Sequence, residues 1–216
     1  MPLNGSHDIR SIVFDLDGTL YVSDAFAATI QDEAAAYMAD LKGLSRDEMR
    51  RLMAATRVRL AEATGAVQTL SAVCTELGGS IPALHAHFER HLRPESFLMR
   101  DNRVIALLER LHRRFSLYIY TNNNQAVATR IIDYLGFSAS VDGLFSIDDG
   151  WRAKPDDIRL EQILAAVGSK PAEVLFVGDR YEVDLRLPEQ KGCPIFLSQS
   201  VEQLLRLDEL LANGKC

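Results

Sequence analysis

The feature that most constrains the fold is a short apolar run that ends in two acids. Residues 11–20 read SIVFDLDGTL, and the β-branched and aromatic side chains at the start predict a strand buried on both faces. Alternation along a strand would place Asp15 and Asp17 on the same side, where their carboxylates repel unless a proton or a cation intervenes. Gly18 then lets the backbone turn and approach a ligand closely. Taken alone, an Asp-Gly turn closing a hairpin explains the stretch equally well.

Downstream of residue 100, apolar runs alternate with amphipathic helical patterns. The runs at 117–120, 143–147, 174–177 and 194–197 predict strands, and patterns with helical spacing separate them. A final helix is expected after Ser200. Strands that alternate with helices favour an α/β fold, with a doubly wound, Rossmann-like parallel sheet and helices on both of its faces.

The segment between the first two predicted strands, residues 21–116, is far longer than the ~10–12 residues of a crossover. Ser23 and Gly43 bound one predicted helix, and a capping box at Ser45 opens a second that carries Met49, Leu52 and Met53 at helical spacing. We therefore expect an α-helical domain over residues 22–95, inserted into an α/β core of residues 1–21 plus 96–216.

Composition excludes several classes of protein. The net charge of −6 argues against a nucleic-acid-binding surface. Cys74, Cys193 and Cys216 are odd in number and widely spaced, so they predict no disulfide framework and favour a reducing compartment. No apolar run approaches the ~18 residues of a membrane span, and the N-terminus lacks a signal-peptide pattern. We expect a soluble, cytoplasmic protein without nucleic-acid or membrane partners.

Polar residues follow the predicted strands at the points where these end. Because ligands bind at the carboxyl edge of open parallel sheets, topology should gather these residues whatever their separation in sequence. They are Asp15 and Asp17 after the first strand, Thr121 and Asn122 after the second, Lys154 after the third, and Asp179 and Asp184 after the fourth.

This set resembles the haloacid dehalogenase-like hydrolase superfamily. DLDGTL at residues 15–20 is similar to its first motif, and YIYTN at residues 118–122, which contains Thr121, is similar to its second. Lys154-Pro155 is similar to the third motif, and GDRYEVD at residues 178–184 is similar to the acidic fourth. The helical insertion directly after the first motif is similar to the family's cap domain. Arg180, Tyr181 and Glu182 depart from the smaller residues common after the first acid of the fourth motif.

The resemblance implies catalytic roles for Asp15, Asp17, Lys154 and Thr121. Asp15 would be the nucleophile that forms an acyl phosphate, and Asp17 the general acid and then the general base. Thr121 and the amide of Asn122 would hold phosphoryl oxygens, and Lys154 would balance negative charge. Gly18 would let the backbone approach the substrate.

The same resemblance implies a magnesium ion. Its ligands would be Asp15, the main-chain carbonyl of Asp17, and Asp179, with Asp184 reached directly or through water. The ion would also relieve the repulsion between the clustered acids.

The function implied is a magnesium-dependent phosphomonoesterase for a small phosphorylated metabolite, of the phosphoglycolate, sugar phosphate or nucleoside monophosphate type, working through an aspartyl phosphate. A phosphomutase, a haloacid dehalogenase or a non-catalytic phosphate-binding module are the alternatives. Asp17 speaks against a dehalogenase, because those family members do not keep this acid.

Three histidines, His85, His87 and His91, share one predicted helix. His87 and His91 stand four residues apart, as two ligands of one metal ion would. The sequence identifies no third ligand for them, so we interpret the group as a polar helix face.

Overall fold

The computed structural model describes residues 9–212, so Cys216 and the outermost residues of the predicted core lie outside the described part. The chain divides into two compact units. One holds residues up to Val22 together with those from Leu98 onward, and the other is Ser23–Phe97. We call them the α/β unit and the helical unit and describe each by itself.

In the described residues, the α/β unit contains a parallel sheet of five strands in the order β3-β2-β1-β4-β5. β1 lies at its centre, where Ile12 pairs with Leu117 on one side and Leu175 on the other. The chain leaves β1 toward β2 and β3 and then crosses back to β4, so the strand order reverses between β1 and β4, where open α/β sheets bind ligands. The strands are β1 (Ser11–Phe14), β2 (Ser116–Tyr120), β3 (Gly143–Phe145), β4 (Val174–Gly178) and β5 (Ile195–Leu197).

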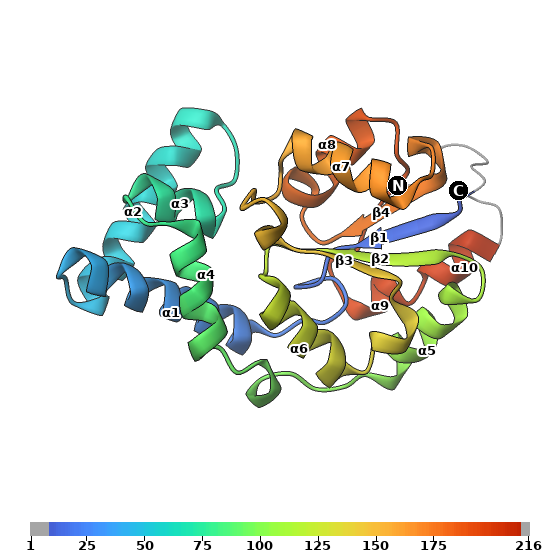
Figure 1. Ribbon diagram of the computed structural model, residues 1–216, viewed down its shortest axis with the longest axis horizontal. Coiled ribbons are helices and arrows are strands. Elements are labelled where there is room, and N and C mark those ends of the chain that lie inside the picture. The colour runs from blue at the N-terminus through green and yellow to red at the C-terminus, as the bar shows by residue number, and fades with distance from the viewer. Residues whose placement is uncertain (1–8, 213–216) are drawn as a thin grey trace. The chain divides into compact units, whose positions relative to one another are not determined.

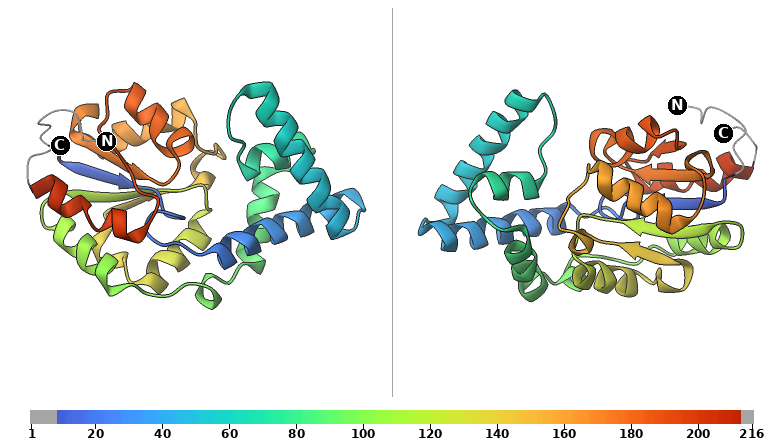
Figure 2. Two further views of the ribbon diagram at one scale, coloured as in Figure 1. Left: turned by 180° about the vertical axis from the view of Figure 1, so that it is seen from behind. Right: turned by 45° about the horizontal axis from the view of Figure 1, so that its top comes forward.

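Helices cover both faces of this sheet (Figure 1). α5 and α6 lie on one face together with the C-terminal helices, and α7 and α8 lie on the other (Figure 2). This arrangement confirms the predicted α/β doubly wound architecture. The helices are α5 (Asn102–His112), α6 (Gln125–Leu135), α7 (Asp157–Val167), α8 (Arg186–Gln190), α9 (Val201–Leu204) and α10 (Leu207–Ala212), with short helical turns η2 (Ser138–Ser140), η3 (Ile147–Asp149), η4 (Pro171–Glu173) and η5 (Tyr181–Leu185), the last of π type.

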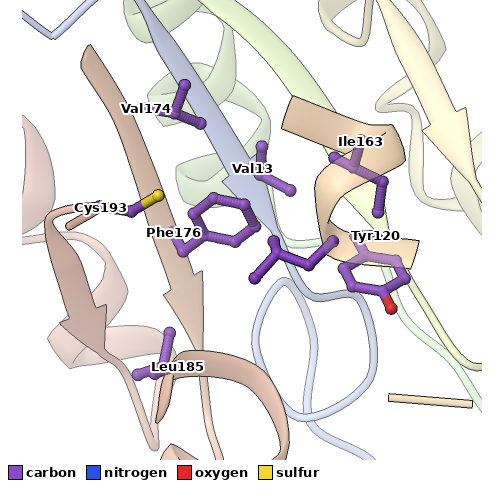
Figure 3. Close-up of a cluster of buried hydrophobic side chains, with 8 residues drawn as sticks. Val13, Tyr120, Ile163, Val174, Phe176, Leu185 and Cys193 are labelled. Carbon is purple, nitrogen blue, oxygen red and sulfur yellow. The ribbon is translucent and has the colours of Figure 1, made fainter. Parts of the chain in front are cut away.

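Apolar side chains pack between the sheet and α7 (Figure 3). Val13 of β1 and Phe176 of β4 meet Leu160 and Ile163 of α7, and each of the four is at most 3% exposed. Burying a large aliphatic or aromatic side chain contributes about 1.5–3 kcal/mol, so this layer holds the central strands in place. β1 and β4, whose ends carry the acidic residues, both contribute side chains to this layer.

The helical unit consists of α1 (Asp24–Lys42), α2 (Arg46–Thr64), α3 (Leu70–Glu76), α4 (Ile81–His91) and the turn η1 (Pro94–Ser96). Ser23 and Ser45 cap α1 and α2 as predicted, and Gly43 and Gly65 end them in the left-handed conformation. Met49 and Met53 are buried, whereas Leu52, which we expected to pack with them, is 39% exposed.

Some boundaries differ from those expected. The strand after Asp142 stops at Phe145, because Ser146 and Asp149 form a capping box that turns the chain into η3. The predicted final helix is broken into α9 and α10. Among residues 9–212, no helix is long and apolar enough to cross a membrane.

Candidate functional site

Asp15 is the first residue after β1 and is 5% exposed. Its backbone N–H donates to the carbonyl oxygen of Val177 at 2.8 Å, which continues the pairing with β4 and fixes where the side chain emerges. Its Oδ1 accepts a hydrogen bond from Lys154 Nζ at 2.6 Å, and its Oδ2 accepts one from Thr19 Oγ1 at 3.1 Å. Both carboxylate oxygens are therefore oriented by neighbours.

Lys154, from the loop after β3, lies at the centre of this network, and its side chain is 2% exposed. Besides Asp15, its Nζ donates to Asp184 Oδ1 at 2.7 Å and to the carbonyl oxygen of Tyr120 at 2.9 Å. An ammonium group has three donors, and all three are used. Lys154 thus joins the ends of β1, β2 and the segment after β4.

Asp17 has a separate set of donors. Its Oδ1 accepts a hydrogen bond from the hydroxyl of Tyr21. Its Oδ2 accepts hydrogen bonds from Asn123 Nδ2 at 2.6 Å and from Thr121 Oγ1 at 3.4 Å. The two acids of the first motif are therefore held differently, Asp15 by a charged lysine and Asp17 by neutral donors.

Asp179 and Asp184 follow β4. Asp184 is 6% exposed, and its Oδ2 accepts a hydrogen bond from the backbone N–H of Arg180 at 3.2 Å. Oδ1 of Asp179 is buried, and within residues 9–212 it has no hydrogen-bond partner, although Arg180 Nε lies 3.5 Å away as an ion pair. A buried carboxylate oxygen without a donor is costly unless something binds it.

Three of these acids could hold a metal ion together. One carboxylate oxygen from each of Asp15, Asp179 and Asp184 lies within 4.8 Å of the others. A donor set made only of carboxylate oxygens suits a hard cation such as Mg²⁺. The unpartnered Oδ1 of Asp179 fits the same purpose, so the residues present match a divalent cation.

Two glycines allow the acids to come this close. Gly18 adopts a φ of +86°, and a Cβ there would stand 2.5 Å from Oδ2 of Asp179. A Cβ on Gly178 would stand 2.5 Å from the Cβ of Asp184. Any larger residue at either position would push an acid away from the site.

Desolvation shifts the ionisation of these groups. Burial raises the pKa of Asp15 to about 7, although Lys154 opposes the shift, and it also raises the pKa of Asp17 and of Asp179. Burial acts to lower the pKa of Lys154, but Asp15 and Asp184 outweigh it and the net direction is upward. The site therefore concentrates negative charge where water solvates it poorly, which favours binding of a cation.

The structure brings the residues predicted from the strand ends into one group. Asn122 contacts this group through the lysine loop: its Oδ1 accepts a hydrogen bond from the backbone N–H of Lys154 at 2.7 Å, so its side chain positions that loop. Sequence reasoning missed Tyr21, Asn123 and Arg180. Asn123 stands next to residues that we singled out, and the departure at Arg180 was visible as a long side chain after Asp179. Nothing in the spacing pointed to Tyr21.

Comparison with known proteins agrees with the α/β fold. Residues 9–189 match the sequence pattern of the family described as haloacid dehalogenase-like hydrolase. A search of curated proteins gave no match.

Similar solved structures include proteins of more than one activity. A HAD phosphatase from Thermococcus onnurineus is 17% identical, with 96% of this chain and 100% of that chain covered and a TM-score of 0.62. A 2-haloacid dehalogenase from Pseudomonas syringae pv. Tomato DC3000 is 18% identical, with coverages of 95% and 99% and a TM-score of 0.62. A putative HAD-hydrolase from Bacillus subtilis bound to magnesium is 20% identical, with coverages of 96% and 99% and a TM-score of 0.60. At these identities the likeness is one of fold.

Proposed function

The chain belongs to the haloacid dehalogenase-like hydrolases, and from this premise we propose that it is a magnesium-dependent phosphomonoesterase. Its substrate would be a small phosphorylated metabolite of the phosphoglycolate, sugar phosphate or nucleoside monophosphate type. The family includes hydrolases of carbon–halogen bonds as well as of phosphate esters. The choice between these reactions must therefore come from the residues of the site.

Asp17 carries the proposal. Breaking a carbon–halogen bond releases a halide, which needs no proton, whereas an alkoxide leaving group does. Asp17 lies two residues beyond Asp15, and Tyr21 and Asn123 both donate hydrogen bonds to its carboxylate. Desolvation raises its pKa, which is the direction that a general acid needs. A second acid held at this place supports ester hydrolysis over dehalogenation.

In the first step, an oxygen of Asp15 attacks phosphorus and the bond from phosphorus to the leaving oxygen breaks. Asp17 donates its proton to that oxygen as it leaves, and an aspartyl phosphate remains. In the second step, Asp17 takes a proton from water, the water oxygen attacks phosphorus, and the bond between phosphorus and the Asp15 oxygen breaks to release inorganic phosphate. Asp15 and Asp17 then regain their starting protonation states.

Two cations, the ammonium group of Lys154 and Mg²⁺, would offset the negative charge of the reacting groups. Lys154 stays bound to Asp15 at 2.6 Å and offsets part of the negative charge as the phosphoryl group arrives. Mg²⁺ held by Asp15, Asp179 and Asp184 would supply further positive charge against the phosphoryl oxygens. Thr121, whose hydroxyl lies beside Asp17, would donate to a phosphoryl oxygen in the bound state.

We assign substrate selection to the helical unit, as a cap formed by residues 22–95. Cap domains exclude water and complete substrate pockets when they close over an active site. The assignment is supported by the insertion point, which directly follows the first motif. The α/β unit alone contains the acids proposed for the chemistry, so the two tasks would be divided between the units.

The test is phosphate release from a broad panel of phosphorylated metabolites and 2-haloacids, each with Mg²⁺ and with excess chelator. We expect release of phosphate from at least one small monoester, dependent on Mg²⁺, and no release of halide. Halide release that persists in chelator would identify a dehalogenase and overturn the proposal. Transfer of phosphate within the substrate, without net release, would identify a phosphomutase.

A further inference from the structure

A second group of potential ligands lies wholly within the helical unit. His87 and His91 are on α4, four residues apart, and their rings stack with centroids 4.1 Å apart and planes inclined by 20°. Glu33 of α1, which precedes His87 by 54 residues, places its Oε2 at 2.8 Å from Nε2 of His87. One donor atom from each of the three residues lies within 4.8 Å of the others.

The sequence identifies no third ligand for the two histidines and favours their interpretation as a polar helix face. The structure places Glu33 beside them as a candidate third ligand. Packing of α1 against α4 brings Glu33 from a distant part of the chain to the two histidines, which gives a set of three potential ligands.

The surroundings hold the three side chains in place while leaving a path for an ion. The side chain of His87 is 11% exposed and that of Glu33 is 22% exposed, whereas His91 is exposed. Tyr37, one turn beyond Glu33 on α1, lies with its ring 6.0 Å from that of His87. Within residues 9–212, Glu33 pairs with His87 and with no lysine or arginine, so the charge of its carboxylate is not neutralised by a permanently charged side chain.

We propose that Glu33, His87 and His91 form a transition-metal site, with Zn²⁺ as the ion that fits best. Two imidazole nitrogens and one carboxylate oxygen are typical zinc ligands, whereas Mg²⁺ prefers oxygen donors alone. Water would complete a tetrahedral site, because these three residues leave the fourth position open. The ion would differ in kind from the one proposed for the acidic group after the strands.

The geometry requires only small movements. Zinc binds histidine nitrogen at about 2.0–2.1 Å, so ligand atoms in a tetrahedral site stand roughly 3.3 Å apart. The donor atoms are already within 4.8 Å of one another, and rotation of the exposed His91 side chain can bring the set together. Coordination through Nε2 of His87 breaks its hydrogen bond to Glu33, and the proton on Nε2 moves to Nδ1 or, from a cationic ring, to solvent.

The bound ion would link the first and the fourth helix of the helical unit. A ligand that binds only the folded form stabilises it. The predicted consequence is a helical unit that becomes more resistant to unfolding when a zinc-class metal is present. This site does not depend on the proposed phosphatase chemistry.

Cobalt(II) provides the probe, because tetrahedral cobalt absorbs strongly in the visible range and takes zinc ligands. The full chain is stripped with chelator, supplied with excess Mg²⁺ to occupy the acidic group, and titrated with Co²⁺. We expect a visible band that saturates at one equivalent and disappears on addition of Zn²⁺. Absence of such a band in the wild-type chain would overturn the proposal.

Variants of the proposed ligands test whether the ion binds at this group. Glu33→Gln and His91→Ala should each weaken Zn²⁺ binding by more than about tenfold, measured by competition with a chromogenic chelator. His91 is exposed, so its replacement should leave the circular dichroism spectrum unchanged. The control is His112→Ala, because His112 pairs with Asp142 in the α/β unit at 3.0 Å. Equal affinity in all of these chains would place the ion elsewhere and refute the assignment.

Discussion

The two groups of potential metal ligands differ in how the chain assembles them. The acids Asp15, Asp179 and Asp184 follow parallel strands, and Glu33, His87 and His91 lie on two helices that pack against each other. A parallel sheet brings its strand ends to one edge for any loop length, whereas two helices can pack at many rotations. Ligand groups at strand ends can therefore be predicted from the order of elements, and groups between helices cannot.

The strongest test of the strand-end group is Asp15→Asn. The amide has nearly the shape of the carboxylate but is a poor nucleophile, so we expect turnover to fall by roughly 10³-fold or more. The rate is measured as phosphate release with the best substrate of the panel. Asp157→Asn serves as the matched control, because Asp157 is 55% exposed and pairs with Lys191. Activity within tenfold of the wild type would remove Asp15 from the role of nucleophile.

Asp17→Asn separates the second acid from the first. With an alkyl phosphate, whose leaving oxygen needs a proton, the first step should slow by roughly 10²–10⁴. With p-nitrophenyl phosphate that step should survive, because the leaving group departs without a proton. The second step would still lack its base, so rapid mixing should show a burst of nitrophenol near one equivalent of enzyme. Equal losses for both esters without a burst would make Asp17 a structural residue only.

Asp179→Ala tests whether the strand-end group binds a cation. Its Oδ1 has no hydrogen-bond partner among the described residues, so removal of the side chain breaks few contacts of the fold. We expect the Mg²⁺ concentration for half-maximal rate to rise by about tenfold or more. A thermal melt checks the fold. An unchanged Mg²⁺ requirement would exclude Asp179 as a ligand.

Gly18→Ala tests the close approach of the first motif to Asp179. The φ of +86° strains any residue with a Cβ, and that Cβ would meet Oδ2 of Asp179 at 2.5 Å. We expect a loss of about 1–2 kcal/mol in the free energy of unfolding, together with a higher Mg²⁺ requirement. Gly150→Ala is a useful comparison, since a Cβ there meets nothing within 4 Å. A Mg²⁺ requirement equal in both variants would argue against the close approach.

The smallest effect is expected when a residue of one ligand group is replaced and metal binding at the other ligand group is measured. His91→Ala should leave the Mg²⁺ requirement of the proposed phosphatase reaction unchanged, because the two groups share no residue. Asp179→Ala should likewise leave Zn²⁺ affinity unchanged. A change in Mg²⁺ requirement on replacing His91 would show that the two groups are coupled, and the contrast drawn between them would then fail.

The sequence predicts local structure well where a cap or a buried run defines it. Ser23, Gly43 and Ser45 bound helices as expected, because each makes hydrogen bonds with residues near it in the chain. It also predicts which residues stand at the strand ends. The sheet order of β3-β2-β1-β4-β5 does not follow from these local signals.

The sequence does not predict contacts or exposure that depend on the direction in which a single side chain points. Tyr21 reaches Asp17 because the chain turns back after Gly18, and Asn123 reaches it from the loop after β2, the strand beside β1. Leu52 illustrates the same limit in the helical unit, since its helical spacing favoured burial and the packing of α2 leaves it exposed. Rotation about a helix axis is decided by all the neighbours together.

The insertion point has a consequence for how such proteins diversify. Ser23, where the helical unit begins, donates a hydrogen bond from its Oγ to the carbonyl oxygen of Phe97, where the unit ends, at 3.3 Å. A segment whose two ends meet can be lengthened, shortened or replaced by recombination without stretching the chain on either side. If the helical unit selects the substrate as we propose, substrate preference can evolve by exchange of this segment, while Asp15, Lys154 and their partners are inherited unchanged.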